Sequence, residues 1–138
     1  MIQALENGKY YHIYNRGINS ATLFKEKTNF EHFLKLYDYH INPVAETYAW
    51  CLMKNHFHFL VRIKNSNEIT LEKKILPSQS FSNFFNAYTK AFNKSYNRHG
   101  ALFERPFRRK EINYDTYFQN VIVYIHKNPV HHNICEHP

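Results

Sequence analysis

Two histidines, His56 and His58, stand one residue apart in the sequence NHFHFLVRI, which runs from Asn55 to Ile63. Alternate side chains of an extended strand project to the same face, so both imidazoles would project together. Two neutral imidazoles on a rigid strand are two ligands of a metal site. Two half-exposed histidines with backbone or water partners would show the same spacing, so the pair alone leaves both interpretations open.

The residues around the histidines predict a strand with one buried face. Four apolar residues occupy the alternate positions of the run: Phe57, Phe59, Val61 and Ile63. These would face a core, and the histidines would share the opposite face with Leu60 and Arg62. Such alternation is typical of a half-buried antiparallel strand.

The rest of the chain must supply the elements that position this strand. Periodicity and turn residues predict the following order: strand 10–17, helix 28–40, strand 44–53, a tight turn at 54–55, the histidine strand, helix 78–96, strand 107–112 and helix 114–127. Thr28 is expected to cap the first helix, with Glu31 completing a capping box.

This order, β-α-β-β-α-β followed by a helix, predicts an α+β fold of the ferredoxin-like, split βαβ type. It implies an antiparallel four-stranded sheet with two helices on one face and the histidine strand near its centre. The other face would remain for the histidines and the last helix. With 138 residues, the chain is expected to form one domain over residues 1–138.

Composition limits the class of protein. The chain is 43% hydrophobic and 17% aromatic, with only 3 Gly and 5 Pro, so it can build a core and is not a low-complexity chain. No run of the sequence approaches the apolar length of a membrane helix, and the first residues lack the layout of a signal peptide. Cys51 and Cys135 form no CxxC motif, so a reducing, cytoplasmic location is expected.

Charge predicts a polyanionic partner, because the formal net charge is +7 and most of it lies in one stretch. The basic residues of that stretch are Lys90, Lys94, Arg98, Arg105, Arg108, Arg109 and Lys110. Aromatic residues are interleaved with them: Tyr88, Phe92, Tyr96, Phe103 and Phe107. Cations for phosphates with aromatic faces for bases are typical of a single-strand nucleic-acid groove. A solvated basic face above core aromatics is the alternative.

The last expected helix carries a tyrosine, Tyr124, at the edge of its apolar stripe, with Asn128 four residues later. Pro129 disfavours helical geometry at Asn128, so the helix should end there. Taken alone, each residue is better explained by structure than by a site: Tyr124 as an amphipathic border tyrosine, and Asn128 as a C-cap.

Three motifs together resemble a known family. The stretch containing Tyr48, Met53, Asn55, His56, His58 and Leu60 is similar to a YxxMxNHxHxL motif, up to small shifts in the leading residues. The late YIHKNPV, residues 124–130, and the opening YHIYNRG, residues 11–17, match further motifs. The chain thus resembles the HUH single-strand nucleases, in particular the single-tyrosine (Y1) transposases and, among them, the REP-associated tyrosine transposases.

That resemblance implies a set of roles. His56 and His58 would be metal ligands, Asn128 the third protein ligand, and Tyr124 the nucleophile that forms a 5′-phosphotyrosine during cleavage and strand transfer. The cofactor would be a divalent ion, Mg²⁺ or Mn²⁺, and the partner single-stranded DNA containing a hairpin. Tyr114 and Tyr117 lie on the same helix as rivals of Tyr124, and both a monomer and a homodimer fit the sequence.

A ferredoxin-like sheet rich in aromatics is also the plan of RNA-recognition-motif domains, which bind RNA without catalysis. In that case His56 and His58 would line a stacking platform, and Tyr124 would be structural. The third strand lacks the basic-Gly-aromatic-Gly pattern of such domains, which favours the nuclease interpretation.

Overall fold

The computed structural model describes residues 3–69, 75–112 and 134–136. The strands are β1 (Tyr10–Arg16), β2 (Ala45–Met53), β3 (His56–Ile63), β4 (Arg108–Ile112) and β5 (Ile134–Glu136). The helices are α1 (Lys27–Ile41) and α2 (Pro77–Ser95), and two short 3-10 turns cover Ile18–Ser20 and Ser66–Glu68. None of the helices in this part of the chain combines the length and apolar character that a bilayer span needs.

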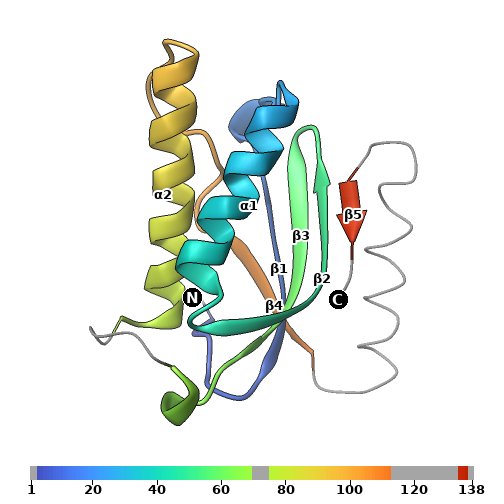
Figure 1. Ribbon diagram of the computed structural model, residues 1–138, viewed down its shortest axis with the longest axis vertical. Coiled ribbons are helices and arrows are strands. Elements are labelled where there is room, and N and C mark those ends of the chain that lie inside the picture. The colour runs from blue at the N-terminus through green and yellow to red at the C-terminus, as the bar shows by residue number, and fades with distance from the viewer. Residues whose placement is uncertain (1–2, 70–74, 113–133, 137–138) are drawn as a thin grey trace.

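The strands form one antiparallel sheet in the order β4-β1-β3-β2-β5, and α1 and α2 pack side by side on one of its faces (Figure 1). The first four strands thus have the ferredoxin-like arrangement that the sequence predicted. β3 lies at the centre of the sheet, as expected for a strand that carries a site.

Element boundaries agree with the sequence to within one or two residues, with two exceptions. The predicted helix 114–127 lies outside the described residues. β5 was not predicted, and it extends the sheet beyond the expected four strands by pairing with Trp50–Leu52 of β2. A strand of three residues has no measurable periodicity, so only its neighbour reveals it.

The predicted cap of the first helix is wrong by two residues. Glu26, and not Thr28, is the N-cap of α1, and its side chain and that of Asn29 form a reciprocal capping box. The backbone N–H groups of Lys25 and Glu26 donate to Asn29 Oδ1 at 2.7 and 3.0 Å. Because Asn29 already satisfies these donors, the helix begins before Thr28, and the expected partner Glu31 is not needed.

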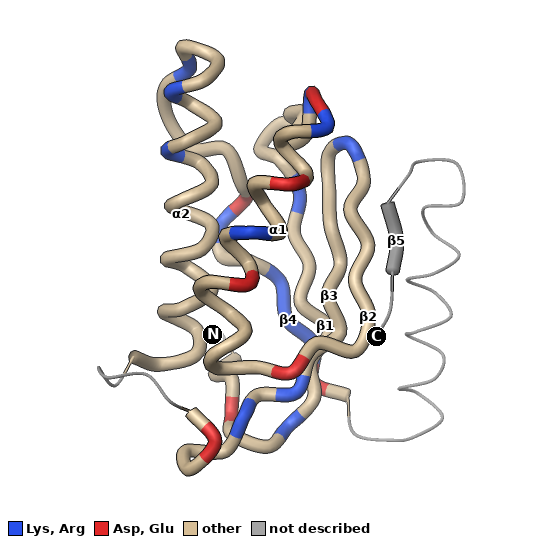
Figure 2. Tube along the Cα trace, in the orientation of Figure 1, with Lys and Arg blue, Asp and Glu red and all other residues tan. Residues whose placement is uncertain are grey.

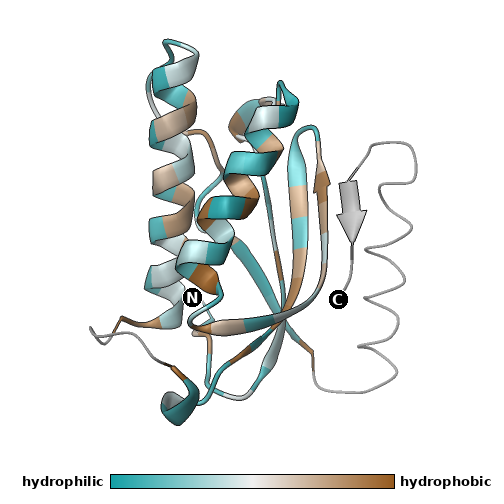
Figure 3. Cartoon of the chain, in the orientation of Figure 1, coloured by the Kyte–Doolittle hydropathy of each residue, from teal (hydrophilic) through white to brown (hydrophobic). Residues whose placement is uncertain are grey.

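The core lies between the helices and the sheet. Phe57, Phe59, Val61 and Ile63 are fully buried in it, as predicted. His58 and Leu60 on the opposite face are buried as well, so β3 is not the half-buried strand that the sequence predicted. Hydrophobic and hydrophilic residues are interspersed along α1, α2 and the strands (Figure 3). Within this core, the Tyr37 ring stacks on Phe59 with 4.1 Å between ring centroids.

Most of the aromatic residues of the basic stretch belong to this core. Tyr88 is only 1% exposed, and Phe92, Phe103 and Phe107 are also buried, while Tyr96 packs against them from the edge. The idea that these rings form a stacking surface for bases is therefore wrong, and the alternative that they are core aromatics is correct. The spacing of Tyr88 and Phe92 along α2 reflects helix packing.

Candidate functional site

The face of the sheet opposite α1 and α2 carries both histidines. The register pairs Arg16 with His56 and Tyr14 with His58 across β1 and β3, and Arg108 with Tyr14 across β4 and β1. Directly opposed residues of antiparallel strands project to the same face. A row of cationic and aromatic side chains therefore flanks the two imidazoles.

His58 is held by a third histidine, His12 of β1. His12 Nε2 and His58 Nδ1 are 2.9 Å apart, and both rings are buried, with 9% and 6% of their surfaces exposed. Burial lowers the pKa of His58 to about 3, helped by the neighbouring His12 and His56. Burial, with the nearby charge of Lys110, lowers the pKa of His12 to about 4. Both imidazoles are therefore neutral at pH 7, which is the state that ligates metals.

His56 is oriented by the turn that precedes β3. His56 Nδ1 lies 2.9 Å from Asn55 Oδ1, and since an amide oxygen only accepts, the ring nitrogen donates. The turn itself is fixed by Gly17, whose N–H donates to the Asn55 carbonyl at 3.0 Å. A Cβ at Gly17 would come within 2.2 Å of the Ala21 carbonyl oxygen, so only glycine fits there.

These hydrogen bonds test whether the histidines suit a metal. Ligating histidines usually donate their second ring N–H to a neighbouring acceptor, which fixes the tautomer. His56 does so through Nδ1, and His58 does so when its Nδ1 donates to His12 Nε2. In both rings Nε2 then carries the lone pair, and the ring centroids are 5.3 Å apart. Both imidazoles can therefore offer Nε2 as a ligand to a divalent ion.

The described residues hold two such ligands and no group of three histidine, cysteine or acidic side chains that could complete a metal site. Asn128, the expected third ligand, and Tyr124, the expected nucleophile, lie outside the described residues, as do Tyr114 and Tyr117. Their roles stay predictions.

A hollow of about 510 Å³ opens at the histidines, lined among others by Tyr14, Arg16 and Arg108. Glu104 links the two arginines: its carboxylate lies 2.8 Å from Arg16 Nε and 3.6 Å from an Arg108 terminal nitrogen. Two guanidinium groups that share one carboxylate leave a net positive charge beside the imidazoles. Such a hollow suits a phosphate group.

The basic stretch does not form one surface. Arg108 and Lys110 project to the histidine face, because β4 pairs them with Tyr14 and His12. Arg109 points to the helix side, where its guanidinium lies 3.6 Å from the Phe107 ring centroid. The alternation of a strand thus separates cations that are adjacent in sequence.

The other predicted DNA-binding residues lie elsewhere. Lys90 and Lys94 are exposed near the end of α2, in the layer on the opposite side of the sheet, apart from the basic segment of β4 (Figure 2). Arg98 closes the loop after α2 by donating to Asn93 Oδ1 and to the Gly100 and Ala101 carbonyls. Arg105 is exposed in the segment before β4.

Sequence reasoning missed three residues of the site: His12, Tyr14 and Arg16. They occupy alternate positions of the first strand, so the same period-two rule that joined His56 with His58 places them on one face. The predicted topology put this strand beside the histidine strand. The period-two rule combined with this predicted strand pairing would have placed His12, Tyr14 and Arg16 at the site.

Comparisons with known proteins bear on the fold. No family model and no curated protein matches the chain. Among solved structures, the chain is similar to a REP-associated tyrosine transposase bound to a REP hairpin, with a TM-score of 0.68 and 14% sequence identity. The match covers 95% of this chain and 72% of that one. The two proteins therefore share an α+β fold with an antiparallel sheet and two packed helices.

Proposed function

We propose that the chain is a metal-dependent enzyme that cleaves and rejoins single-stranded DNA through a covalent tyrosine intermediate, in the manner of REP-associated tyrosine transposases. The observation that carries the proposal is the pair of imidazoles on the central strand. His58 lies within hydrogen-bond distance of His12, and His56 donates through Nδ1 to Asn55. Both histidines line the same hollow as Arg16 and Arg108. The shared fold with a transposase supports it.

His56 and His58 would hold a divalent ion through Nε2, with Asn128 as the third protein ligand. Mixed nitrogen and oxygen ligands suit Mg²⁺ or Mn²⁺ at cellular concentrations. When bound, the ion would withdraw charge from a non-bridging oxygen of the scissile phosphate. Asn55 and His12 would serve as the outer residues that keep the two rings in the ligating tautomer.

Tyr124 would be the nucleophile. Its phenolic oxygen forms a bond to phosphorus as the bond to the 3′ oxygen breaks, and the phenolic proton is lost while the departing oxygen becomes a 3′ hydroxyl. Phenolate, with a pKa near 10, is a far better leaving group than an alkoxide. A later 3′ hydroxyl can therefore displace the tyrosine and rejoin a strand, which suits strand transfer better than hydrolysis.

Arg16, Arg108 and Lys110 would hold the phosphates of the strand at the histidine face, since they are the cations nearest the imidazoles in the register. The transposase with the similar fold was solved with a DNA hairpin, so a hairpin-bearing single strand is the proposed substrate. The proposal leaves the chain free to act as a monomer or as a homodimer.

A titration with Mn²⁺ tests the metal site. His56→Ala removes one proposed ligand from a half-exposed position, so it should abolish measurable Mn²⁺ binding without unfolding the chain. His99→Ala is the matched control, because His99 is exposed in the loop after α2. Equal Mn²⁺ affinity in wild type and His56→Ala would overturn the metal site.

A non-catalytic nucleic-acid-binding module is the second candidate, because Tyr10 and Tyr14 lie half-buried on the face of β1 opposite α1 and α2, and such modules stack bases on a sheet face. Incubation with Mn²⁺ and hairpin-bearing single-stranded DNA separates the two functions. A DNA adduct that survives denaturant supports the enzyme. DNA binding without any adduct supports the module.

A further inference from the structure

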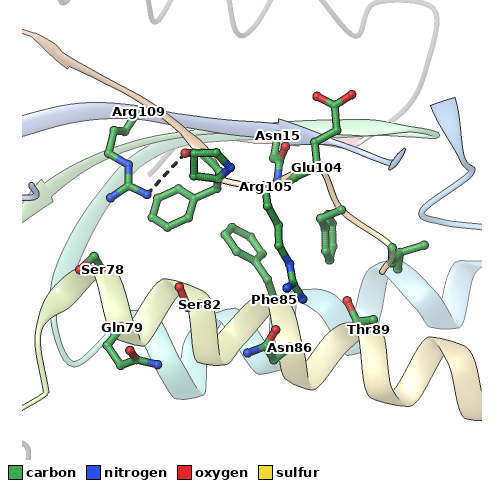
Figure 4. Close-up of a pocket in the computed structure, with 14 residues that line it drawn as sticks. Asn15, Ser78, Gln79, Ser82, Phe85, Asn86, Thr89, Glu104, Arg105 and Arg109 are labelled. Atoms are coloured by element: carbon green, nitrogen blue, oxygen red, sulfur yellow. Dashed lines mark hydrogen bonds between the residues drawn. The ribbon is translucent and has the colours of Figure 1, made fainter. Parts of the chain in front are cut away.

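A second hollow lies on the helix side of the sheet, away from the histidines. It is a groove of about 640 Å³ between α2 and the segment from Leu102 to Arg109. Ser78, Ser82, Asn86 and Thr89 of α2 form one wall, and Arg105 reaches across from the opposite segment (Figure 4). Its volume is within the range of sites that enclose a small ligand or part of a larger one.

Two buried polar atoms in this groove have no hydrogen-bond partner within the part of the chain that the structure describes. Asn15 is only 3% exposed, and its Nδ2 donates to the Glu104 carbonyl at 2.8 Å, which leaves Oδ1 as an unpaired acceptor. Arg109 donates through its terminal nitrogens to the Gln3 and Phe107 carbonyls, while its buried Nε is an unpaired donor. Buried polar atoms are rarely left unpaired, so a ligand that offers both a donor and an acceptor is indicated.

The remaining lining narrows the class of ligand. The amide of Asn86 and the hydroxyl of Ser82 can each donate and accept, and the buried rings of Phe85 and Phe107 also line the groove. Amide side chains pair with the edges of nucleobases. Arg105 adds a cation for a phosphate. A nucleobase with its phosphate matches all of these groups.

The groove is tied to the histidine hollow by its wall. Asn15 lines both hollows, and the Glu104 N–H donates to the Arg16 carbonyl at 3.0 Å, so this segment is fixed to the end of β1. Among the described strands β4 lies at the edge of the sheet, and Arg105 and Arg108 line one further hollow beside it. Single-stranded DNA that extends from the histidine hollow can therefore pass around the β4 edge of the sheet, beside Arg108 and Arg105.

We propose that the groove between α2 and residues 102–109 binds one unpaired nucleobase of the same DNA strand whose phosphate lies at the histidines. This rests on the proposed function, and it adds a position at which the protein senses a base away from the cleaved bond. Asn15 and Asn86 would contact the base edge, and Arg105 would contact its phosphate.

The test uses fluorescein-labelled, hairpin-bearing single strands of roughly 20 nucleotides. In a matched set, one nucleotide at a time outside the hairpin stem is replaced by an abasic site. Fluorescence anisotropy of the full chain then measures affinity. In wild type, the abasic site at one position should weaken binding by about fivefold or more, because one base loses its contacts.

Two variants act on the groove. Ser82→Trp fills the groove from the α2 wall. Asn86→Ala removes an exposed amide, so it should leave the stability of the fold nearly unchanged. Both should bind the intact strand more weakly and lose the abasic effect at that position. Ser95→Trp is the matched control, because it places the same ring at the exposed end of the same helix, outside the groove, and should keep the wild-type abasic profile.

An unchanged abasic profile in both Ser82→Trp and Asn86→Ala would overturn the proposal. Titration with the four deoxynucleoside monophosphates separates a free nucleotide from a strand: saturable binding that Ser82→Trp blocks, without any abasic effect on strands, would also overturn it. The tyrosine adduct is scored in the same preparations. An adduct without dependence on the groove defeats this inference alone, whereas a groove-dependent profile without an adduct defeats the proposed chemistry alone.

Discussion

Replacement of His12 by leucine is expected to weaken divalent-metal binding while leaving the chain folded. His12 touches no proposed substrate position, but its Nε2 lies 2.9 Å from His58 Nδ1 and accepts a proton from it in the ligating tautomer. Leucine cannot accept that hydrogen bond. Loss of an outer partner of a metal-bound histidine typically costs about 10- to 100-fold in affinity, which corresponds to about 1.4 to 2.7 kcal/mol.

The effect on stability should be smaller. The lost hydrogen bond contributes about 0.5 to 1.5 kcal/mol, and leucine is an apolar side chain in a buried position that pairs with Leu60. Chemical denaturation in chelator should therefore show a cooperative transition close to that of wild type. Titration calorimetry with Mn²⁺ then measures the metal affinity of the folded variant.

Two further variants make this experiment decisive. His12→Gln keeps an oxygen that can accept from His58 Nδ1, so it should recover part of the affinity. His99→Leu makes the same substitution at an exposed loop histidine and should bind Mn²⁺ as wild type does. A folded His12→Leu variant with wild-type affinity would refute the reasoning, because His58 would then not need its neighbour to ligate.

Three other outcomes are expected. On denaturing gels, Tyr124→Phe should abolish the DNA adduct, whereas Tyr117→Phe should retain most of it. Loss of the adduct in Tyr117→Phe and not in Tyr124→Phe would make Tyr117 the nucleophile. Arg108→Ala should lower the salt dependence of DNA binding by about 0.7 of a unit in the logarithmic slope, while Lys94→Ala, in the opposite layer, should change it less. With chelator present, the His58 contribution should lower the free energy of unfolding by about 2 kcal/mol between pH 7 and pH 5. The pKa of His58 is lowered in the folded chain, so the unfolded chain binds more protons in that pH range. In denaturation experiments, the His58→Phe variant should lose this part of the pH dependence.

Much of the fold could be predicted from the sequence because its signals are local. Phe57 and Phe59 alternate with His56 and His58, and this period of two fixes which side chains share a face whatever the strand pairs with. Helix periodicity and turn residues likewise gave the order of elements, and the order restricts the topology to a ferredoxin-like sheet. The start of α1 was placed too late because Glu26 and Asn29 cap each other, a reciprocal arrangement that competes with Thr28 over the same few residues.

The partners within the site depend on contacts between distant parts of the chain. His12 meets His58 only because β1 pairs with β3 in one register, and a shift of one residue would send His12 to the core. Pairing with β1 likewise decides that Arg108, and not Arg109, shares the face of the histidines, because Arg108 lies opposite Tyr14. Residues 102–109 meet α2 by packing, which forms the groove around Asn15. Local sequence determined which residues could act together, and non-local pairing decided which of them do, because register and packing depend on residues far apart along the chain.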